Sequence, residues 1–358
     1  MWGPGLSNYL IMPRSSSLSA CSLMSDHLGL SEARENLILA LARQIRRAYF
    51  RKFSPPRPTF TLSDVPSQQG KVVIVTGGAS GIGQELVRML YEKGATVYIA
   101  GRSESHAQAA IQTIQVSTIR TTSNTTGGQL YYLPLHLDDL TTIKSTVSAF
   151  ASRESRLDLL VNNAGVSQPP LGSVSAQGIE LQIATNCLGP YLLTQLLLPF
   201  LTAAVTANNE FSPAPRVIWT SSQVAELSAS PEGIILSELR DPPRDAVRNY
   251  VTSKLGNWFL SVEFARRYRD AGLVSVAQNP GAANTNLLRN ARWMKLLSWP
   301  LLYPLGSTAS RGGAGLGPAF GAGGGGRHWA GGRVLGVVRG ADEGLFVMIL
   351  LGTIEQSP

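Results

Sequence analysis

The chain has 358 residues, of which 44% are hydrophobic and only 15% are charged, and its net charge is +8. This length suits one large α/β domain with further segments at its ends. Two cysteines give neither a disulfide framework nor the ligand spacing of a zinc site, which favours a reducing, cytoplasmic location. No apolar run reaches the roughly 20 residues that span a bilayer. Four scattered histidines argue against a metal site and against a Ser-His-Asp hydrolase.

Residues 1–54 are expected to form an N-terminal arm. Within 31–53, arginines and lysines crowd a stretch in which apolar residues recur at helical spacing: Leu37, Leu41, Ile45 and Tyr49. A basic amphipathic helix of this kind could contact an anionic membrane surface, which would make the protein membrane-associated. The alternative is a short helix that packs on the domain edge or stays solvated. Prolines at 55, 56 and 58 then form a linker.

From about residue 55 to 305, short apolar segments alternate with helical ones. The predicted strands are Val72–Val75, Ala95–Ala100, Leu157–Val161, Arg216–Thr220 and Leu273–Ala277. The predicted helices are Gln84–Lys93, Thr141–Ser152, Gly178–Ala203 and Asp245–Asp270. This alternation predicts a single α/β domain with a Rossmann-type, doubly wound parallel sheet that helices cover on both faces. Ligands of such sheets bind at the carboxyl ends of the strands.

The segment 306–358 has a different composition, with dense glycine at 312–317 and 323–326. So much glycine carries a large backbone entropy, which opposes an ordered structure. Two interpretations stay open for this atypical glycine-rich end: a flexible tail, and a mis-spliced or frame-shifted gene model.

The first predicted strand runs into the segment TGGASGIG at 76–83, which leads into a helix. Missing side chains let the backbone approach a phosphate, and the helix N-terminus supplies unpaired N–H groups and the positive end of its dipole. We therefore expect a dinucleotide pyrophosphate to bind here, although an ordinary tight turn is the alternative. The expected binding residues are Gly77, Ser80, Gly81, Ile82 and Gly83.

The second predicted strand ends in Ala100-Gly101-Arg102-Ser103, where no carboxylate could accept a hydrogen bond from the ribose 2′-OH of NAD. Arg102 is suited instead to pair with a 2′-phosphate through a charge-assisted fork. NADP(H) is therefore favoured over NAD(H) as the cofactor. The alternative is a solvated arginine at a strand end.

Tyr250 and Lys254 are four residues apart in NYVTSK, so they face the same side of a predicted helix. A free tyrosine has a pKa near 10, which is too high for a base at neutral pH. The ammonium of Lys254 favours tyrosinate, so we expect it to lower the pKa of Tyr250. Tyr250 could then give a proton to a carbonyl oxygen or take one from an alcohol. For this pair alone, an exposed helix face is the alternative.

Four motifs occur in order: the glycine turn at 76–83, NNAG at 162–165, Tyr250-x-x-x-Lys254, and Pro280-Gly281. With this ordered set the chain resembles the short-chain dehydrogenases/reductases, and most of all fungal members of the retinol-dehydrogenase-like branch, over about residues 55–305. The resemblance implies an NADP-dependent oxidoreductase that interconverts a small-molecule alcohol and a ketone or aldehyde by hydride transfer. The alternative is a non-catalytic nucleotide-binding regulator on the same fold. No nucleic-acid partner is expected, because the basic charge is concentrated in the N-terminal arm.

The resemblance also implies roles for single residues. Ser222 matches the catalytic serine that holds the substrate oxygen, with Ser221 as the alternative. Asn186 matches the asparagine that supports a proton relay, although a helix-kinking polar residue is the plainer interpretation. Lys254 would also bind the nicotinamide ribose. Asp138 matches the position that meets the adenine, and it could equally cap the next helix. Asn162–Gly165 would line the cofactor, and the segment 280–285, with Ala283 and Thr285, would close over the nicotinamide carboxamide.

Relatives of this kind finish with a helix and a last strand that complete the sheet and help to form a dimer, which implies a homo-oligomer. The glycine-rich end shows no convincing equivalent of that last strand. The segment between Ser222 and Tyr250, at about 225–248, is expected to border the substrate site.

Overall fold

The computed structural model describes residues 64–121, 127–207, 213–222, 225, 228–230, 232–280 and 333–335. The chain divides into two units, 1–54 and 55–358, and every described residue belongs to the second unit. The predicted helix within 31–53 therefore lies outside the described residues. The predicted cofactor contacts Ala283 and Thr285 lie outside them as well.

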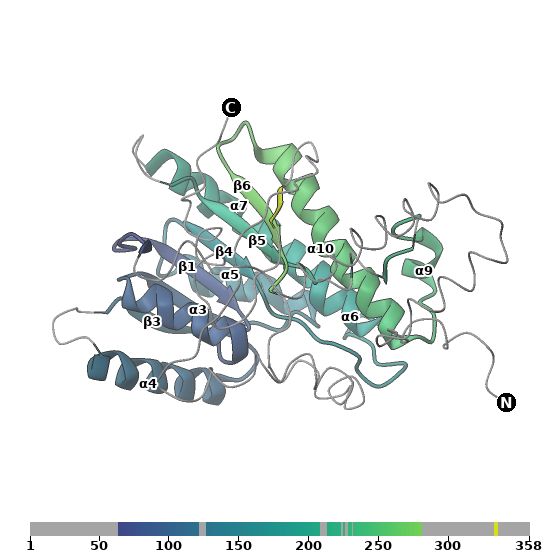
Figure 1. Ribbon diagram of the computed structural model, residues 1–358, viewed down its shortest axis with the longest axis horizontal. Helices are drawn as coiled ribbons and strands as arrows, with labels where there is room; N and C mark the ends of the chain where they lie inside the picture. The colour runs from purple at the N-terminus through teal and green to yellow at the C-terminus, as the bar shows by residue number, and fades with distance from the viewer. Residues whose placement is uncertain are drawn as a thin grey trace, which may run out of the picture. The chain divides into compact units, whose positions relative to one another are not determined.

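The described strands form one parallel sheet in the order β3-β2-β1-β4-β5-β6-β7 (Figure 1). The strands are β1 (Val72–Thr76), β2 (Thr96–Gly101), β3 (Gln129–Pro134), β4 (Leu159–Asn162), β5 (Arg216–Thr220), β6 (Val274–Gln278) and β7 (Arg333–Leu335). The chain runs outward from β1 to β3 and then returns past β1 to β4. This reversal is the Rossmann strand order, and sheets of this order bind their ligands at the carboxyl ends of the strands beside the reversal, here β1 and β4. The predicted fold class is confirmed.

Helices lie on both faces of the sheet (Figure 1). The helical elements are α3 (Gly81–Glu92), α4 (Glu104–Thr121), η2 (Leu140–Thr142), α5 (Ile143–Ala151), α6 (Leu181–Ile183), η3 (Ala184–Leu188), α7 (Gly189–Ala207), α9 (Leu236–Arg240) and α10 (Ala246–Tyr268). Apolar residues of α3 and α4 pack on one face, whereas those of α5, α7 and α10 pack on the other.

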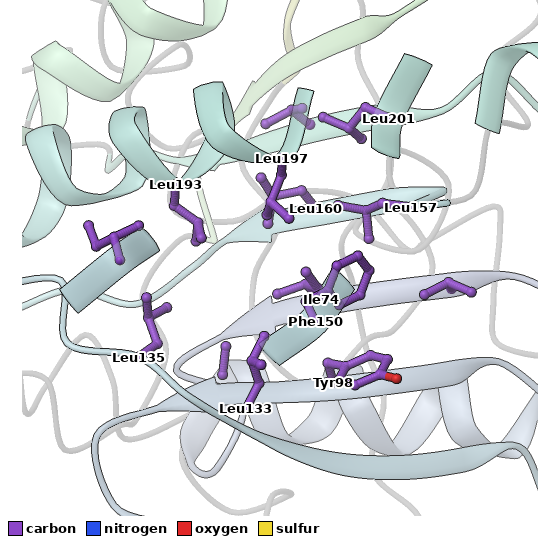
Figure 2. Close-up of a cluster of buried hydrophobic side chains, with 14 of the residues drawn as sticks. Ile74, Tyr98, Leu133, Leu135, Phe150, Leu157, Leu160, Leu193, Leu197 and Leu201 are labelled. Atoms are coloured by element: carbon purple, nitrogen blue, oxygen red, sulfur yellow. The ribbon is translucent and has the colours of Figure 1, made fainter. Parts of the chain in front are cut away.

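Two apolar cores result from the alternation of side chains along each strand. In β1, Val73 and Val75 enter the core beneath α3 and α4, while Ile74 enters the core on the opposite face. Figure 2 shows that second core, in which leucines from α7 lie against the sheet: Leu193, Leu197 and Leu201. These leucines recur every four residues and so share one side of the helix. Full burial of each stabilises the fold by roughly 1.5–3 kcal/mol.

One described helical stretch, Leu181–Ala207, is long and apolar enough to cross a membrane by length and composition alone. The expectation that no apolar run reaches that length is therefore wrong on this measure. Much of the apolar character of this stretch comes from leucines of α7 that pack in the core and cover the sheet.

The last strand, β7, comes from within the glycine-rich segment and pairs in parallel with β6. Three backbone pairings define it: Val276 with Arg333, Ala277 with Val334, and Gln278 with Leu335. The expectation that this segment holds no convincing last strand was wrong. Strand pairing uses backbone groups, so a short edge strand needs no apolar run to mark it.

Candidate active site

Close backbone contacts shape the turn between β1 and α3. Gly77 has a φ of +67°, in the left-handed region that favours glycine. A Cβ at Gly83 would lie 2.4 Å from the carbonyl oxygen of Gly77 and 2.7 Å from Nδ2 of Asn163. No larger residue fits at position 83 without moving the backbone. At Gly77 and Gly83 the turn therefore presents backbone without side chains at the carboxyl end of β1.

The start of α3 fits an anionic group. Ser80 is the N-cap, yet its side chain makes no capping hydrogen bond and is exposed. The first turn, which begins at Gly81, holds no acidic residue, and Ile82 packs against the core beneath α3 and anchors the turn. Free N–H groups and the helix dipole both favour a phosphate at such an end. The residues at 77–83 therefore fit a dinucleotide pyrophosphate.

Hydrogen bonds join the ends of β1 and β4 at the point where the strand order reverses. The backbone N–H of Asn163 donates to Oγ1 of Thr76 at 3.0 Å, and its Nδ2 donates to the carbonyl of Thr76 at 3.0 Å. Asn162 is buried and donates instead to Oγ1 of Thr194 on α7 at 3.0 Å. Within the segment 162–165 that was expected to line the cofactor, Asn163 thus contacts the glycine turn, whereas Asn162 contacts α7. Adjacent residues at a strand end point to opposite sides, and this separates the two asparagines.

Arg102 and Asp138 lie together beyond the ends of β2 and β3. Nη1 of Arg102 is 3.4 Å from Oδ2 of Asp138, and the two side chains are 58% and 28% exposed. The capping role considered for Asp138 belongs to its neighbour Asp139, whose side chain accepts from the N–H of Thr141 at 3.1 Å. The arginine and the carboxylate predicted to meet the two ends of the adenosine are therefore paired with each other.

The N-cap of α10 fixes where this helix begins and therefore where Tyr250 lies along it. The side chain of Asp245 accepts from the N–H groups of Val247 and Arg248 at 2.9 and 3.0 Å, so the helix begins at Ala246. A cap of this kind stabilises a helix by about 1 kcal/mol. Tyr250 follows on the second turn, in the position that the predicted helix Asp245–Asp270 gave it.

The hydroxyl of Tyr250 is hydrogen-bonded to Ser222, just beyond the carboxyl end of β5. Burial raises the pKa of Tyr250 to about 12, and the bond with Ser222 opposes this rise. The expected lowering of this pKa by Lys254 is therefore wrong for the structure as described. The Nζ of Lys254 lies 5.8 Å from the centroid of the Tyr250 ring, and the loss of water around the phenol outweighs its charge.

Lys254 is buried and donates from Nζ to the carbonyl of Thr220 at 3.0 Å. Asn257, one turn further along α10, donates to the same carbonyl at 2.9 Å. Burial lowers the pKa of Lys254 to about 8. Ser221 donates from Oγ to the carbonyl of Lys254 at 2.7 Å and thus joins β5 to α10. Of the two serines, Ser222 meets the tyrosine and Ser221 anchors the helix.

Asn186 lies in η3, a π-helical turn, and is completely buried. Its Oδ1 accepts from the N–H of Val166 at 2.8 Å, and its Nδ2 donates to the carbonyl of Val166 at 3.0 Å and to Oγ of Ser253 at 2.9 Å. Short π-helical turns occur frequently at functional sites. Here the turn brings Asn186 between the segment after β4 and α10, directly beside Ser253.

A cavity of about 200 Å³ lies between the segment before α10 and the segment after β4. Its walls include Pro169, Pro170, Leu171, Pro242, Pro243 and Asn249. The 225–248 segment, expected to border the substrate, therefore ends at a cavity beside the first turn of α10.

A family model described as short chain dehydrogenase matches residues 71–295 of this chain. The chain belongs to the short-chain dehydrogenase/reductase family. Short-chain dehydrogenase/reductase iacJ of Pestalotiopsis fici is 46% identical over 249 residues, which are 69% of this chain and 75% of the relative. A short-chain dehydrogenase/reductase of Phomopsis amygdali is also 46% identical, over 256 residues, 70% of this chain and 74% of the relative.

A crystal structure of a short-chain type dehydrogenase/reductase from Mycobacterium marinum shares the fold of this short-chain dehydrogenase/reductase. Its TM-score is 0.51 at 19% identity, and the match covers 67% of this chain and 84% of the other. The family resemblance inferred from the motifs is confirmed, as is the assignment to an oxidoreductase enzyme with a nucleotide-binding fold. The similar proteins found by sequence include fungal members.

Proposed function

We propose that this short-chain dehydrogenase/reductase interconverts an alcohol and a ketone or aldehyde by hydride transfer, with Tyr250 as its acid–base group and NADP(H) as its preferred cofactor. One observation carries the proposal: Tyr250 and Ser222 are hydrogen-bonded at the carboxyl end of β5, with Lys254 one helical turn away. The glycine turn lies at the same end of the sheet, at the carboxyl end of β1.

The chemistry follows from these side chains. The nicotinamide of a bound cofactor would supply or accept the hydride. Tyr250, whose raised pKa of about 12 keeps it neutral at physiological pH, would give its proton to a carbonyl oxygen during reduction. Ser222 would hold that oxygen and stabilise the charge that develops on it. Lys254 would bind the nicotinamide ribose. Its ammonium would either give up its hydrogen bond to the carbonyl of Thr220 or keep that bond and use another of its N–H groups.

Arg102 supports the preference for NADP(H). It is largely exposed at the end of β2, and no carboxylate occupies the strand end at 100–103. Asp138 holds Arg102 through an ion pair at 3.4 Å, a weak contact for two partly exposed groups. A 2′-phosphate carries more charge than one carboxylate and would compete well for the guanidinium. The carboxylate of Asp138 would then be released toward the adenine.

Tyr250→Phe tests the proposal. The variant removes only the phenolic oxygen, so we expect it to lower NADPH oxidation with reactive aldehydes and ketones by about 100-fold or more. NADPH binding, followed by the change in nicotinamide fluorescence, stays within about twofold, because the hydroxyl contributes little to cofactor affinity. Tyr131→Phe, on the edge strand β3, is the control and retains activity.

Two results would contradict the proposal. One is turnover in Tyr250→Phe that equals the wild-type rate. The other is a wild-type protein that binds NADPH but oxidises none of it across a broad carbonyl panel, which is the behaviour of a nucleotide-binding regulator.

A further inference from the structure

Gln182 lies completely buried between two segments on which the proposed chemistry depends, the turn after β4 and the start of α10. Its Oε1 accepts a hydrogen bond from the backbone N–H of Gln168 at 2.9 Å. Its Nε2 donates to the carbonyl of Ala246 at 3.0 Å and to the carboxylate of Glu180 at 3.2 Å. One carboxamide therefore joins the turn after β4 to the first residue of α10.

The backbone at Gln168 needs such a restraint. Its φ is +49°, and it is the sole non-glycine residue with a left-handed backbone in the part of the chain that the structure describes. This conformation costs roughly 1–3 kcal/mol and persists where surrounding contacts impose it. The bond from Gln168 to the buried carboxamide of Gln182 is a contact of that kind. Strain held in this way is typical of functional sites.

The bond to Ala246 reaches Tyr250 through the helix backbone. In an α-helix the carbonyl of Ala246 also accepts from the N–H four residues later, which is that of Tyr250. On the other side, Oγ of Ser253 donates to the carbonyl of Tyr250 at 2.8 Å, and Asn186 donates to Ser253 at 2.9 Å. Gln182 and Asn186 thus hold the backbone before and after the tyrosine.

We propose that Gln182 is a positioning residue for Tyr250, a role that rests on the acid–base function proposed above. Through Gln168 and Ala246 it fixes the separation between the turn after β4 and α10, and with it the place where the hydroxyl meets Ser222. The cavity of about 200 Å³ between these two segments gives the first turn of α10 room to shift once the carboxamide is lost. Misplacement of a reacting group by about 1 Å can cost about 100-fold in rate.

Gln182→Met tests this role, because methionine nearly matches the volume of glutamine but makes none of the three hydrogen bonds. We expect kcat to fall about 10- to 100-fold while KM for NADPH stays within about twofold. Gln177→Met is the control: that carboxamide is exposed and makes two bonds, with the N–H of Leu140 and the carboxylate of Asp139, but none with α10. Leu197→Ala lowers stability from within the core and shows what destabilisation alone does to kcat.

Gln182→Glu adds a readout that a general loss of stability would not move. The introduced carboxyl can accept from Gln168, but it can donate to Ala246 only when it is protonated. Burial and the adjacent carboxylate of Glu180 both favour the protonated form, so the deficit in kcat relative to wild type should shrink as the pH is lowered from about 8 to about 6. A deficit that is constant over this range would contradict the proposal.

Hydrogen exchange at the Tyr250 amide separates this inference from the proposed activity. We expect faster exchange in Gln182→Met than in Gln177→Met or Leu197→Ala, and this holds whether or not a substrate has been found. If the wild type turns over no carbonyl compound, the proposed function fails and exchange alone decides the role of Gln182. Exchange and kcat in Gln182→Met that match both controls would overturn it.

Discussion

Lys254 donates a hydrogen bond to the carbonyl oxygen of Thr220 at 3.0 Å, so the lysine of the Tyr-x-x-x-Lys pair is hydrogen-bonded to the end of β5, while its ammonium lies 5.8 Å from the centroid of the Tyr250 ring. The side chain is buried, and its pKa is lowered from 10.5 to about 8. A folded-state pKa below the unfolded value means that the protonated lysine destabilises the fold. This cost is fully present below pH 8 and fades as the pH rises to 10.5.

Lys254→Met should therefore stabilise the cofactor-free protein while it abolishes turnover. The shift in pKa corresponds to a cost on the order of 3 kcal/mol below pH 8, from which the lost bond to Thr220 subtracts. The advantage of the variant should shrink by about 1.4 kcal/mol per pH unit above pH 8. Denaturant unfolding of both proteins at several pH values measures this. A difference in unfolding free energy that does not change with pH would contradict the burial argument.

The two serines after β5 should separate into a chemical and a structural role. Ser222→Ala removes the partner of the Tyr250 hydroxyl, so we expect kcat to fall about 100- to 1,000-fold at nearly unchanged stability. Ser221→Ala removes the 2.7 Å bond to the carbonyl of Lys254, so it should cost about 1 kcal/mol of stability and much less of kcat. Steady-state kinetics and thermal unfolding of both variants measure the contrast. Equal losses of kcat in the two would show that the assignment is wrong.

Arg102→Ala should weaken selection of NADPH over NADH. Loss of a charge-assisted bond to a 2′-phosphate should raise KM for NADPH about tenfold or more and leave KM for NADH within about twofold. Arg266→Ala is the control, because Arg266 is 68% exposed and pairs with Glu263 on the same helix. Initial rates with each cofactor measure the effect. A parallel rise in KM for both cofactors would argue that Arg102 acts on the fold and not on the phosphate.

The buried strands could be predicted because both faces of the sheet are covered. Four consecutive apolar residues at Val72–Val75 are typical of a strand that is buried on both sides, and β2, β4, β5 and β6 are likewise buried over at least four consecutive residues. β3 was missed because it is only partly buried. α4 was missed too, although a signal exists: Ala107, Ile111 and Ile114 recur at helical spacing and enter the core.

The candidate site could be predicted only where its residues are close in sequence. Tyr250 and Lys254 share a helix, so their spacing alone places them together. The contacts of Gln182 and Asn186 depend on how separate segments cross, which no local pattern records. The direction of the pKa of Tyr250 was wrong for the same reason: the sequence shows the nearby lysine but not the burial of the phenol.

The helical stretch from Leu181 to Ala207 carries Gln182 before the π-helical turn of η3 and the core leucines of α7 after it. Both sets of contacts depend on how the two parts of the stretch are rotated relative to each other. Each residue of an α-helix adds about 100° of rotation. Deleting one residue within 189–192, where the helix is a regular α-helix, would turn the rest of α7 by about that angle relative to α6. Either Gln182 could keep its bond to α10 or Leu197 could keep its place in the core, but not both. Substitutions on the exposed side of α7 should therefore be tolerated far better than an insertion or deletion in its first turn.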